Sequence, residues 1–318
     1  MTADFEKKIP VIAVVGATAS GKTKLAVEIC KRFNGEVVSA DSMQIYKGMS
    51  VATAKPTAEE MCGIPHHLTD FLPVSEKYCV KQFVSDASNA IYDIASRGRL
   101  AVIAGGTGLY VDSLLSGTVF EDEPDSAEVR EKLRIRRDRE GIEAVYAELE
   151  SVDPETAHSL HINNEGRVLR ALEVYYLTGE KPSVRRARSR LAESPFEPFY
   201  ISVEYKDREK LYERINKRVD IMVQNGLVEE AREYFRLDNA CTASAAIGYK
   251  ELAPFFDGEI TLDEALEGLK QATRRYAKRQ LTWYRNKENI NRIYVDCLPD
   301  GVTAADEAES LIKAWKKL

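Results

Sequence analysis

Short apolar segments alternate with longer amphipathic ones along most of the chain. Runs rich in β-branched residues predict buried strands at Pro10–Val15, Glu36–Ala40, Leu100–Ala104, Phe199–Glu204 and Arg292–Val295. Continuous apolar strands separated by amphipathic stretches are typical of a parallel sheet with helices on both faces. The pattern therefore predicts an α/β protein.

The middle of the chain, between residues 121 and 195, shows no convincing strand pattern. Asp153-Pro154 is typical of a helix start and Gly179 of a helix end. Helical periodicity is present at Ala127–Arg139, Ile142–Ser151 and Glu165–Leu177, and again in the flanking parts at Lys24–Phe33, Asp207–Gln224 and Leu262–Arg285. The simplest organisation is a core, residues 1–120 and 198–318, interrupted by an all-helical insertion, residues 121–197. Ser183–Pro198 is charge-rich and is predicted to be a hinge or linker.

Composition narrows the class of protein. The 318 residues carry a net charge of −6 and five scattered cysteines, with no pair at metal-ligand spacing. Such cysteines suit a reducing cytoplasm. No apolar run is long enough for a membrane span, and the N-terminus does not resemble a signal peptide. We therefore expect a cytoplasmic protein without a membrane partner.

Basic residues cluster despite the acidic net charge. The three clusters are Arg134, Arg136, Arg137 and Arg139; Arg185, Arg186, Arg188 and Arg190; and Arg274, Arg275, Lys278, Arg279 and Arg285. Each cluster is either a solvated helix face or part of a surface for nucleic-acid phosphates.

A phosphate-binding loop is the strongest single motif. Gly16, Ala17, Thr18, Ala19, Ser20, Gly21, Lys22 and Thr23 match G-x-x-x-x-G-K-[ST] between a predicted strand and a predicted helix. Backbone N–H groups and the helix N-terminus attract phosphate oxygens, Lys22 adds a full charge, and the Thr23 hydroxyl can bind Mg²⁺. ATP, GTP and an isoprenyl diphosphate all satisfy such a loop.

Two further strand ends carry candidate chemistry. Asp41 follows the second strand, where a carboxylate can act as a general base, bind Mg²⁺ through water, or simply cap a helix. Gly105–Tyr110 follows the third strand and suggests a close approach of the backbone to a ligand. The adjacent His66 and His67 have no third ligand nearby in sequence, so structural hydrogen bonding is favoured over a metal site.

Together these motifs resemble the tRNA dimethylallyltransferase (tRNA isopentenyltransferase) family. The resemblance spans nearly the whole chain, through Gly16–Thr23, Ser39–Met49, Ala52–Pro56, Gly63–Leu68, Gly105–Tyr110, Arg167–Val174, Arg214–Asp220, Ala246–Glu251 and Thr273–Trp283. Departures are Ile162 where the family usually has Pro, Gly166 where a basic residue is common, and Tyr284 in place of Phe.

The resemblance implies a fold and a reaction. The implied fold is a P-loop, kinase-like parallel sheet with a helical insertion that grips the anticodon stem-loop of tRNA. The implied reaction transfers the dimethylallyl group of dimethylallyl diphosphate to N6 of the adenosine immediately 3′ of the anticodon, with Mg²⁺ as cofactor. We expect the enzyme to be a monomer.

Roles carried over by the resemblance fall into three groups. The loop Gly16–Thr23 would hold the diphosphate, with Thr23 on the metal. The catalytic residues would be Asp41 as the base facing N6, with Lys22, Thr107 and Arg218 at the diphosphate or the transferring centre. The tRNA contacts would come from Asp41, Ser42, Met43, Gln44, Thr107, Arg167, Arg170, Arg275 and Arg279.

Three other functions remain open at this point. A small-molecule kinase would use the same loop with ATP, but it leaves the basic insertion without a purpose. An adenylate isopentenyltransferase would act on free nucleotide and needs no insertion. A non-enzymatic RNA-binding protein would not need Lys22, Thr23 and Asp41 together.

Overall fold

The computed structural model describes residues 8–121, 126–236 and 246–315, and Cys241 lies outside them. The chain forms two compact units, one of Met1–Leu115 with Pro195–Leu318 and one of Ser116–Ser194. The sequence placed these boundaries a few residues later, at 120/121 and 197/198. No helix within the described ranges has the length and apolar character required to span a membrane.

The larger unit is built on a six-stranded sheet in the order β3-β2-β4-β1-β5-β6. Its strands are β1 (Ile9–Gly16), β2 (Gly35–Ser39), β3 (His66–His67), β4 (Leu100–Ala104), β5 (Phe196–Glu204) and β6 (Ile290–Tyr294). Every adjacent pair is parallel, which confirms the predicted sheet. The β3 strand was not predicted because two residues are too few to show a pattern.

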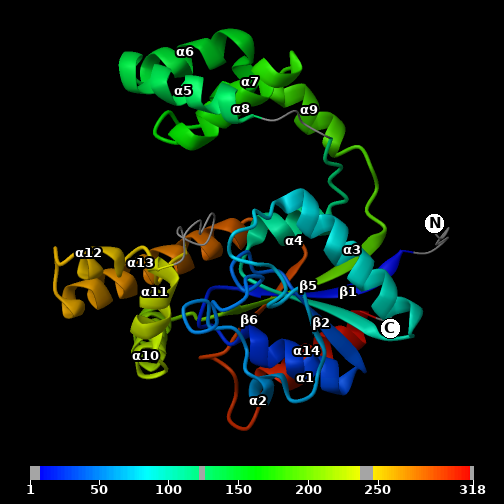
Figure 1. Ribbon diagram of the computed structural model, residues 1–318. Coiled ribbons are helices and arrows are strands. Elements are labelled where there is room, and N and C mark those ends of the chain that lie inside the picture. Colours follow the sequence, from blue (N-terminus) through cyan, green and yellow to red (C-terminus); the bar gives the residue numbers. More distant parts are fainter. Residues whose placement is uncertain (1–7, 122–125, 237–245, 316–318) are drawn as a thin grey trace. The chain divides into compact units, whose positions relative to one another are not determined.

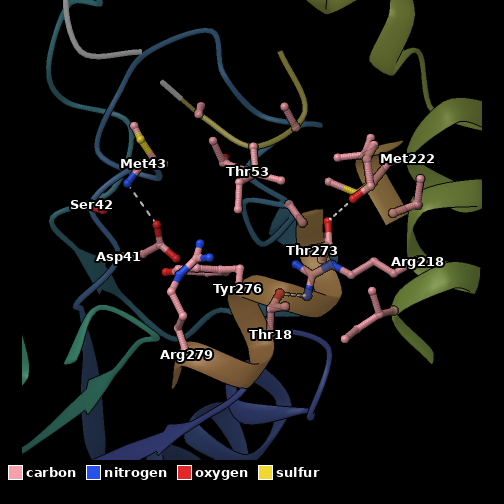
Figure 2. Close-up of a pocket in the computed structure, with 17 residues that line it drawn as sticks. Thr18, Asp41, Ser42, Met43, Thr53, Arg218, Met222, Thr273, Tyr276 and Arg279 are labelled. Atoms are coloured by element: carbon pink, nitrogen blue, oxygen red, sulfur yellow. Dashed lines mark hydrogen bonds between the residues drawn. The ribbon is translucent and has the colours of Figure 1, made fainter. Parts of the chain in front are cut away.

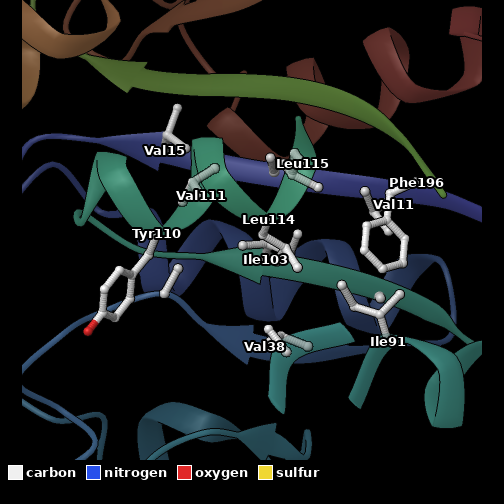
Figure 3. Close-up of a cluster of buried hydrophobic side chains, with 14 of the residues drawn as sticks. Val11, Val15, Val38, Ile91, Ile103, Tyr110, Val111, Leu114, Leu115 and Phe196 are labelled. Carbon is white, nitrogen blue, oxygen red and sulfur yellow. The ribbon is translucent and has the colours of Figure 1, made fainter. Parts of the chain in front are cut away.

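Helices cover both faces of this sheet (Figure 1). On one face, α3 (Val80–Ser96) and α4 (Gly108–Leu115) pack against Val11, Val38 and Ile103, as Figure 3 shows. The opposite face is covered by α1 (Lys22–Arg32) and α14 (Ala304–Trp315). Each aliphatic side chain buried in these layers contributes about 1.5–3 kcal/mol to folding.

The remaining helices of this unit, except α2, contribute to a third apolar cluster. They are α2 (Ala58–Met61), α10 (Arg208–Gln224), α11 (Leu227–Phe235), α12 (Ala253–Phe256) and α13 (Leu262–Tyr284). Leu227, Tyr249 and Leu269 lie at the centre of that cluster. The α13 helix begins with a capping box in which the side chains of Thr261 and Glu264 each accept the other's backbone N–H.

The smaller unit contains only helices among its described residues. They are α5 (Ala127–Glu140), α6 (Ile142–Val152), α7 (Pro154–His158), α8 (Glu165–Thr178) and α9 (Pro182–Ser189). Asp153 caps α7 and Gly179, at φ 70°, ends α8, as predicted. The predicted linker Ser183–Pro198 is wrong for its first half, because Pro182 at the first helical position starts α9.

Three loops lie together at the carboxyl-terminal ends of the strands. The central strand β1 has β4 on one side and β5 on the other, so the connections leave it in opposite directions. In parallel sheets, ligands bind at the carboxyl ends of the strands where this reversal occurs. The loops that follow β1, β2 and β4 begin at Ala17, Ala40 and Gly105, and all three lie there.

Candidate active site

The loop after β1 has the backbone conformation that binding of phosphate requires. Gly16 and Gly21 have φ angles of 137° and 101°, which a residue with a side chain rarely adopts. A Cβ at Gly16 would also clash with the backbone oxygen of Val203. Gly21 is the N-cap of α1, so the N-terminus of that helix points into the loop.

Two polar groups of the loop, the partly buried Lys22 and the buried Ser20, have no carboxylate partner in the described part of the chain. The Nζ of Lys22 donates to the backbone oxygen of Ala17 at 2.6 Å. Burial, aided by the nearby charge of Arg218 and opposed by that of Asp41, lowers the pKa of Lys22 to about 7. The hydroxyl of Ser20 is buried and has no hydrogen-bond partner in the described part of the chain. An anion in the cavities that Lys22 lines would supply the counter-charge that Lys22 lacks.

Asp41 lies at the end of β2 and is held through one oxygen. Its Oδ1 accepts the backbone N–H groups of Met43 at 2.9 Å and Gln44 at 3.3 Å. Residues 42–45 form a turn and not a helix, so Asp41 does not act as a helix cap. The other oxygen of the carboxylate remains available toward the cavity that Asp41 lines.

The loops after β2 and β4 are joined by hydrogen bonds. The N–H of Ser42 donates to the Oγ1 of Thr107 at 3.1 Å, and the N–H of Thr107 donates to the backbone oxygen of Ala40 at 3.2 Å. A Cβ at Gly105 would clash with Ala40. This glycine therefore permits a close approach of two segments of the chain, in addition to lining the small cavity between them.

Arg218 reaches the phosphate loop from α10. Its Nη1 donates to the Oγ1 of Thr18 at 3.4 Å, and one turn earlier the Nε of Arg214 donates to the backbone oxygen of Ala19 at 3.1 Å. Burial lowers the pKa of Arg218, while the negative charge of Asp41 opposes that shift. The guanidinium is therefore held close to both the loop and the carboxylate.

Three cavities meet at Arg218, which lines all of them. The first, of about 690 Å³, is lined by several cationic groups, among them Lys22, Lys55, Arg214 and Lys217. The second, of about 290 Å³, contains Asp41 and is otherwise largely apolar. A third of about 60 Å³ lies between the phosphate loop and Asp41. A basic and an apolar compartment thus adjoin across one arginine.

Figure 2 shows the apolar compartment from within. Tyr276 and Arg279 extend from α13 toward Asp41, and Met222 of α10 lies on the far side with Arg218. Tyr276, Met222, Thr53 and the buried Gln280 were not among the predicted site residues. Gln280 and Tyr276 lie inside the Thr273–Trp283 motif, so the motif contained them without indicating a role.

The predicted tRNA-binding residues do not all lie in one place. Asp41, Ser42 and Met43 line the apolar compartment together with Arg279, whereas Gln44 and Thr107 support the surrounding loops. The amide of Gln44 donates to the backbone oxygens of residues 53 and 54 at 3.2 Å. Arg275 is exposed on α13, while Arg167 and Arg170 belong to the helical unit.

The three arginine clusters differ in their partners. In the helical unit, Arg136 pairs with Glu140 and Glu148, and Arg188 pairs with Glu121 and Glu180. On α13, Arg274 pairs with Glu267. Within the described ranges, Arg275, Lys278 and Arg285 form no ion pair.

The histidine pair of β3 has the predicted hydrogen-bonding role. His67 Nε2 lies 2.7 Å from the carboxylate of Glu36, and His66 Nδ1 lies 2.8 Å from the backbone oxygen of Ile64. The guanidinium groups of Arg97 and Arg99 also bind Glu36 and hold its pKa at about 2.

The oxygen donors at the small cavity fit the coordination chemistry of Mg²⁺. Thr23 and Asp41 both line it. Mg²⁺ usually takes one or two protein oxygens and completes its shell with substrate phosphates and water, so a dedicated cage of carboxylates is unnecessary. No group of three or more His, Cys, Asp or Glu side chains forms such a cage in the part of the chain that is described.

Comparisons with known proteins agree on one family. The family model described as IPP transferase matches residues 44–287, and that described as isopentenyl transferase matches residues 9–70. The tRNA dimethylallyltransferase of Caldanaerobacter subterraneus is 46% identical over 91% of this chain and 92% of its own length. That of Bacillus subtilis is 46% identical over 89% and 90%.

Solved structures give the same result. The tRNA isopentenylpyrophosphate transferase of Bacillus halodurans has a TM-score of 0.71 at 42% identity, covering 97% of this chain and 96% of its own. A eukaryotic dimethylallyltransferase acting on tRNA has a TM-score of 0.79 at 30% identity, covering 96% of this chain and 79% of its own.

Proposed function

This chain belongs to the tRNA dimethylallyltransferase family, and we propose that it transfers the dimethylallyl group of dimethylallyl diphosphate to N6 of the adenosine immediately 3′ of the anticodon in tRNA. Diphosphate is the second product. The observation that carries the proposal is the pair of compartments that meet at Arg218, one basic and one apolar with a carboxylate.

The basic compartment suits the diphosphate of the donor. Lys22, the N–H groups of the loop and the N-terminus of α1 converge there. As the C–O bond of the donor breaks, the leaving diphosphate gains negative charge. Lys22 and Arg218 are placed to stabilise that charge.

The apolar compartment suits the acceptor base and the five-carbon chain. An exocyclic amine of adenine is a weak nucleophile, so its proton must leave as the new N–C bond forms. Asp41 can accept that proton through the oxygen that the turn leaves free. The base must leave the stacked RNA loop to reach Asp41, as in other enzymes that modify bases.

Mg²⁺ is part of the same proposal. Thr23 would hold the ion directly and Asp41 through water, next to the donor phosphates. When bound, the ion neutralises charge on the diphosphate. The loop and helix that would hold it support a relation to P-loop kinases, and an RNA substrate implies a cytoplasmic location.

The alternatives make different demands on the acceptor site. A kinase must bring an acceptor hydroxyl to a terminal phosphate, and nothing in that reaction calls for an apolar compartment beside the carboxylate. An adenylate isopentenyltransferase would act on free nucleotide and leaves the helical unit of Ser116–Ser194 without a function.

The position of the modified adenosine is tested with short RNAs. An anticodon stem-loop with adenosine 3′ of the anticodon and a matched one with guanosine there are incubated with dimethylallyl diphosphate and Mg²⁺. Mass spectrometry of the released nucleosides should find prenylated adenosine only from the first RNA. Prenylation at another adenosine would contradict the assigned position, and prenylation of free AMP alone would favour the adenylate enzyme.

A further inference from the structure

A single buried amide joins two of the three loops at the site. Gln280 lies on α13 and is 5% exposed. Its Oε1 accepts the backbone N–H of Thr18, in the phosphate loop, at 2.8 Å. Its Nε2 donates to the backbone oxygen of Gly106, in the loop after β4, at 2.9 Å. No function described above uses this contact.

The chemistry of the two partners suits a side-chain amide. A backbone N–H can only donate and a backbone oxygen can only accept, so the bridging side chain must accept at one end and donate at the other. A carboxylate has no donor, and an apolar side chain of the same size has neither function. Gly106 is buried and Thr18 is partly buried, so a lost bond leaves a poorly solvated polar group unsatisfied.

Gly106 is shaped for this contact. A Cβ at Gly106 would clash with the Nε2 of Gln280, so the glycine is required for the amide to approach. The loop after β4 continues into Thr107, which binds Ser42 in the loop of Asp41. Gln280 therefore lies at the junction between the diphosphate side and the carboxylate side.

The same segments carry the groups that would meet the substrates. Thr18 also accepts a hydrogen bond from Arg218, and Tyr276 lies one turn before Gln280 and lines the apolar compartment. Both ends of the Gln280 bridge thus contact segments that position predicted catalytic groups. The small cavity, which Gln280 lines, separates Lys22 from Asp41.

We propose that Gln280 is a positioning residue that fixes the phosphate loop at the correct distance from the Asp41–Thr107 side of the site. This inference rests on the proposed function of the site and adds a residue to it. Gln280 touches neither reacting atom, and it acts through Thr18 and Gly106. Its loss should let the loop shift, and a displacement of about 1 Å can reduce a rate on the order of 100-fold.

The test uses an apolar substitution of nearly equal size. Gln280→Met should raise the KM for dimethylallyl diphosphate and lower kcat by about 10- to 100-fold together. The KM for tRNA should stay within about twofold, because the exposed face of α13 is unchanged. Gln271→Met is the matched control, since Gln271 is exposed on the same helix and lines no cavity described above; it should match the wild type.

A second variant leaves Gln280 in place. Gly106→Ala should displace the amide and reproduce the defect, and the double variant should be little worse than either single one, because both break the same contact. Circular dichroism and thermal melting establish the folded fraction of each variant. If the kinetic defects of Gln280→Met and Gly106→Ala were fully additive, the two substitutions would not act through one contact, and the inference would be overturned.

Binding of inorganic pyrophosphate with Mg²⁺, measured by calorimetry, separates this inference from the proposed function. Gln280→Met should weaken pyrophosphate binding at least about tenfold, whether or not the wild type prenylates tRNA. An unchanged pyrophosphate affinity and an unchanged KM for the donor in folded Gln280→Met would overturn the inference. Absence of prenyl transfer by a wild type that binds pyrophosphate would instead overturn the proposed function.

Discussion

Positive charges at the carboxyl ends of the strands and positive charges in the helical unit have different surroundings. Lys22 and Arg218 form no salt bridge in the part of the chain that is described, and burial lowers the pKa of each. Arg136 and Arg188 of the helical unit each face two carboxylates. A partly buried charge without a partner is costly, which favours a place where a ligand supplies the missing anion. Paired arginines hold the helices of their own unit together.

Substitution of Asp41, the carboxylate near Lys22 and Arg218, should have the largest effect on activity. Asp41→Asn keeps the size of the side chain but removes the base, so single-turnover prenyl transfer should fall by about 10²–10⁴. The affinity for tRNA should stay within a few-fold. Asp263→Asn, at an exposed position in the first turn of α13, is the control and should match the wild type. Near-normal turnover of Asp41→Asn would reject Asp41 as the base.

The lowered pKa of Lys22 predicts a pH dependence of diphosphate binding. Lys22 is protonated below about pH 7 and loses its charge above it. Bound diphosphate favours the charged form, so pyrophosphate affinity should fall as the pH rises through 7, by up to about tenfold per unit. Calorimetry between pH 6 and 8.5 (about 0.5-unit steps) measures this change.

Lys22→Arg is the control for this titration, because arginine stays charged throughout the range. Any dependence that remains in that variant belongs to the pyrophosphate itself. Equal pH profiles for the wild type and Lys22→Arg would show that Lys22 is already fully charged at neutral pH, contrary to the structure.

The contrast between paired and unpaired arginines predicts a smaller effect on RNA binding. Arg275→Ala should weaken binding of tRNA and reduce the slope of log affinity against log salt by about one, because an unpaired cation is free to displace a counterion. Arg136→Ala removes the same charge from a paired position and should change the slope little. Equal losses in the two variants, measured by filter binding at several salt concentrations, would break the comparison.

Arg136→Ala should instead lower the stability of the protein, and this is the smallest of the expected effects. Its pairs with Glu140 and Glu148 are partly exposed, so their loss should cost at most about 1 kcal/mol of the free energy of unfolding. Urea denaturation of Arg136→Ala and Arg275→Ala measures this difference, and only the first should be destabilised. A lower stability for Arg275→Ala alone would reverse the assignment of the two roles.

The sheet and the phosphate loop were predictable because their determinants are local. Apolar runs indicate strands, and Gly16, Gly21, Lys22 and Thr23 lie within eight consecutive residues. Asp41 was found because it directly follows a strand. The pairing of the arginines was not predictable, since Glu121 and Glu148 lie far in sequence from some of their partners. The ion pairs of Arg188 in α9 are also invisible in the sequence, so this charge-rich helix resembled a linker.

Contacts across the fold account for the site residues that sequence missed. Gln280 and Thr18 are 262 positions apart, and only the packing of α13 against the phosphate loop brings them together. Nothing in the sequence distinguishes Met222 and Thr53 from other helix and loop residues, and only the folded chain shows that they line the apolar compartment. The roles of Arg218, Thr107 and most of the tRNA-contacting residues remain predictions, whereas the variants above test Asp41, Arg275 and the charge of Lys22.

The central claim is that the basic compartment serves a prenyl diphosphate and the apolar one serves an adenine of tRNA. One preparation is incubated with Mg²⁺ and either radiolabelled dimethylallyl diphosphate or ATP labelled in its terminal phosphate, each with and without unmodified tRNA. The account predicts label in the RNA from the prenyl donor only, and no hydrolysis of ATP. Phosphoryl transfer from ATP to a small acceptor, with no label in the RNA from the prenyl donor, would contradict it.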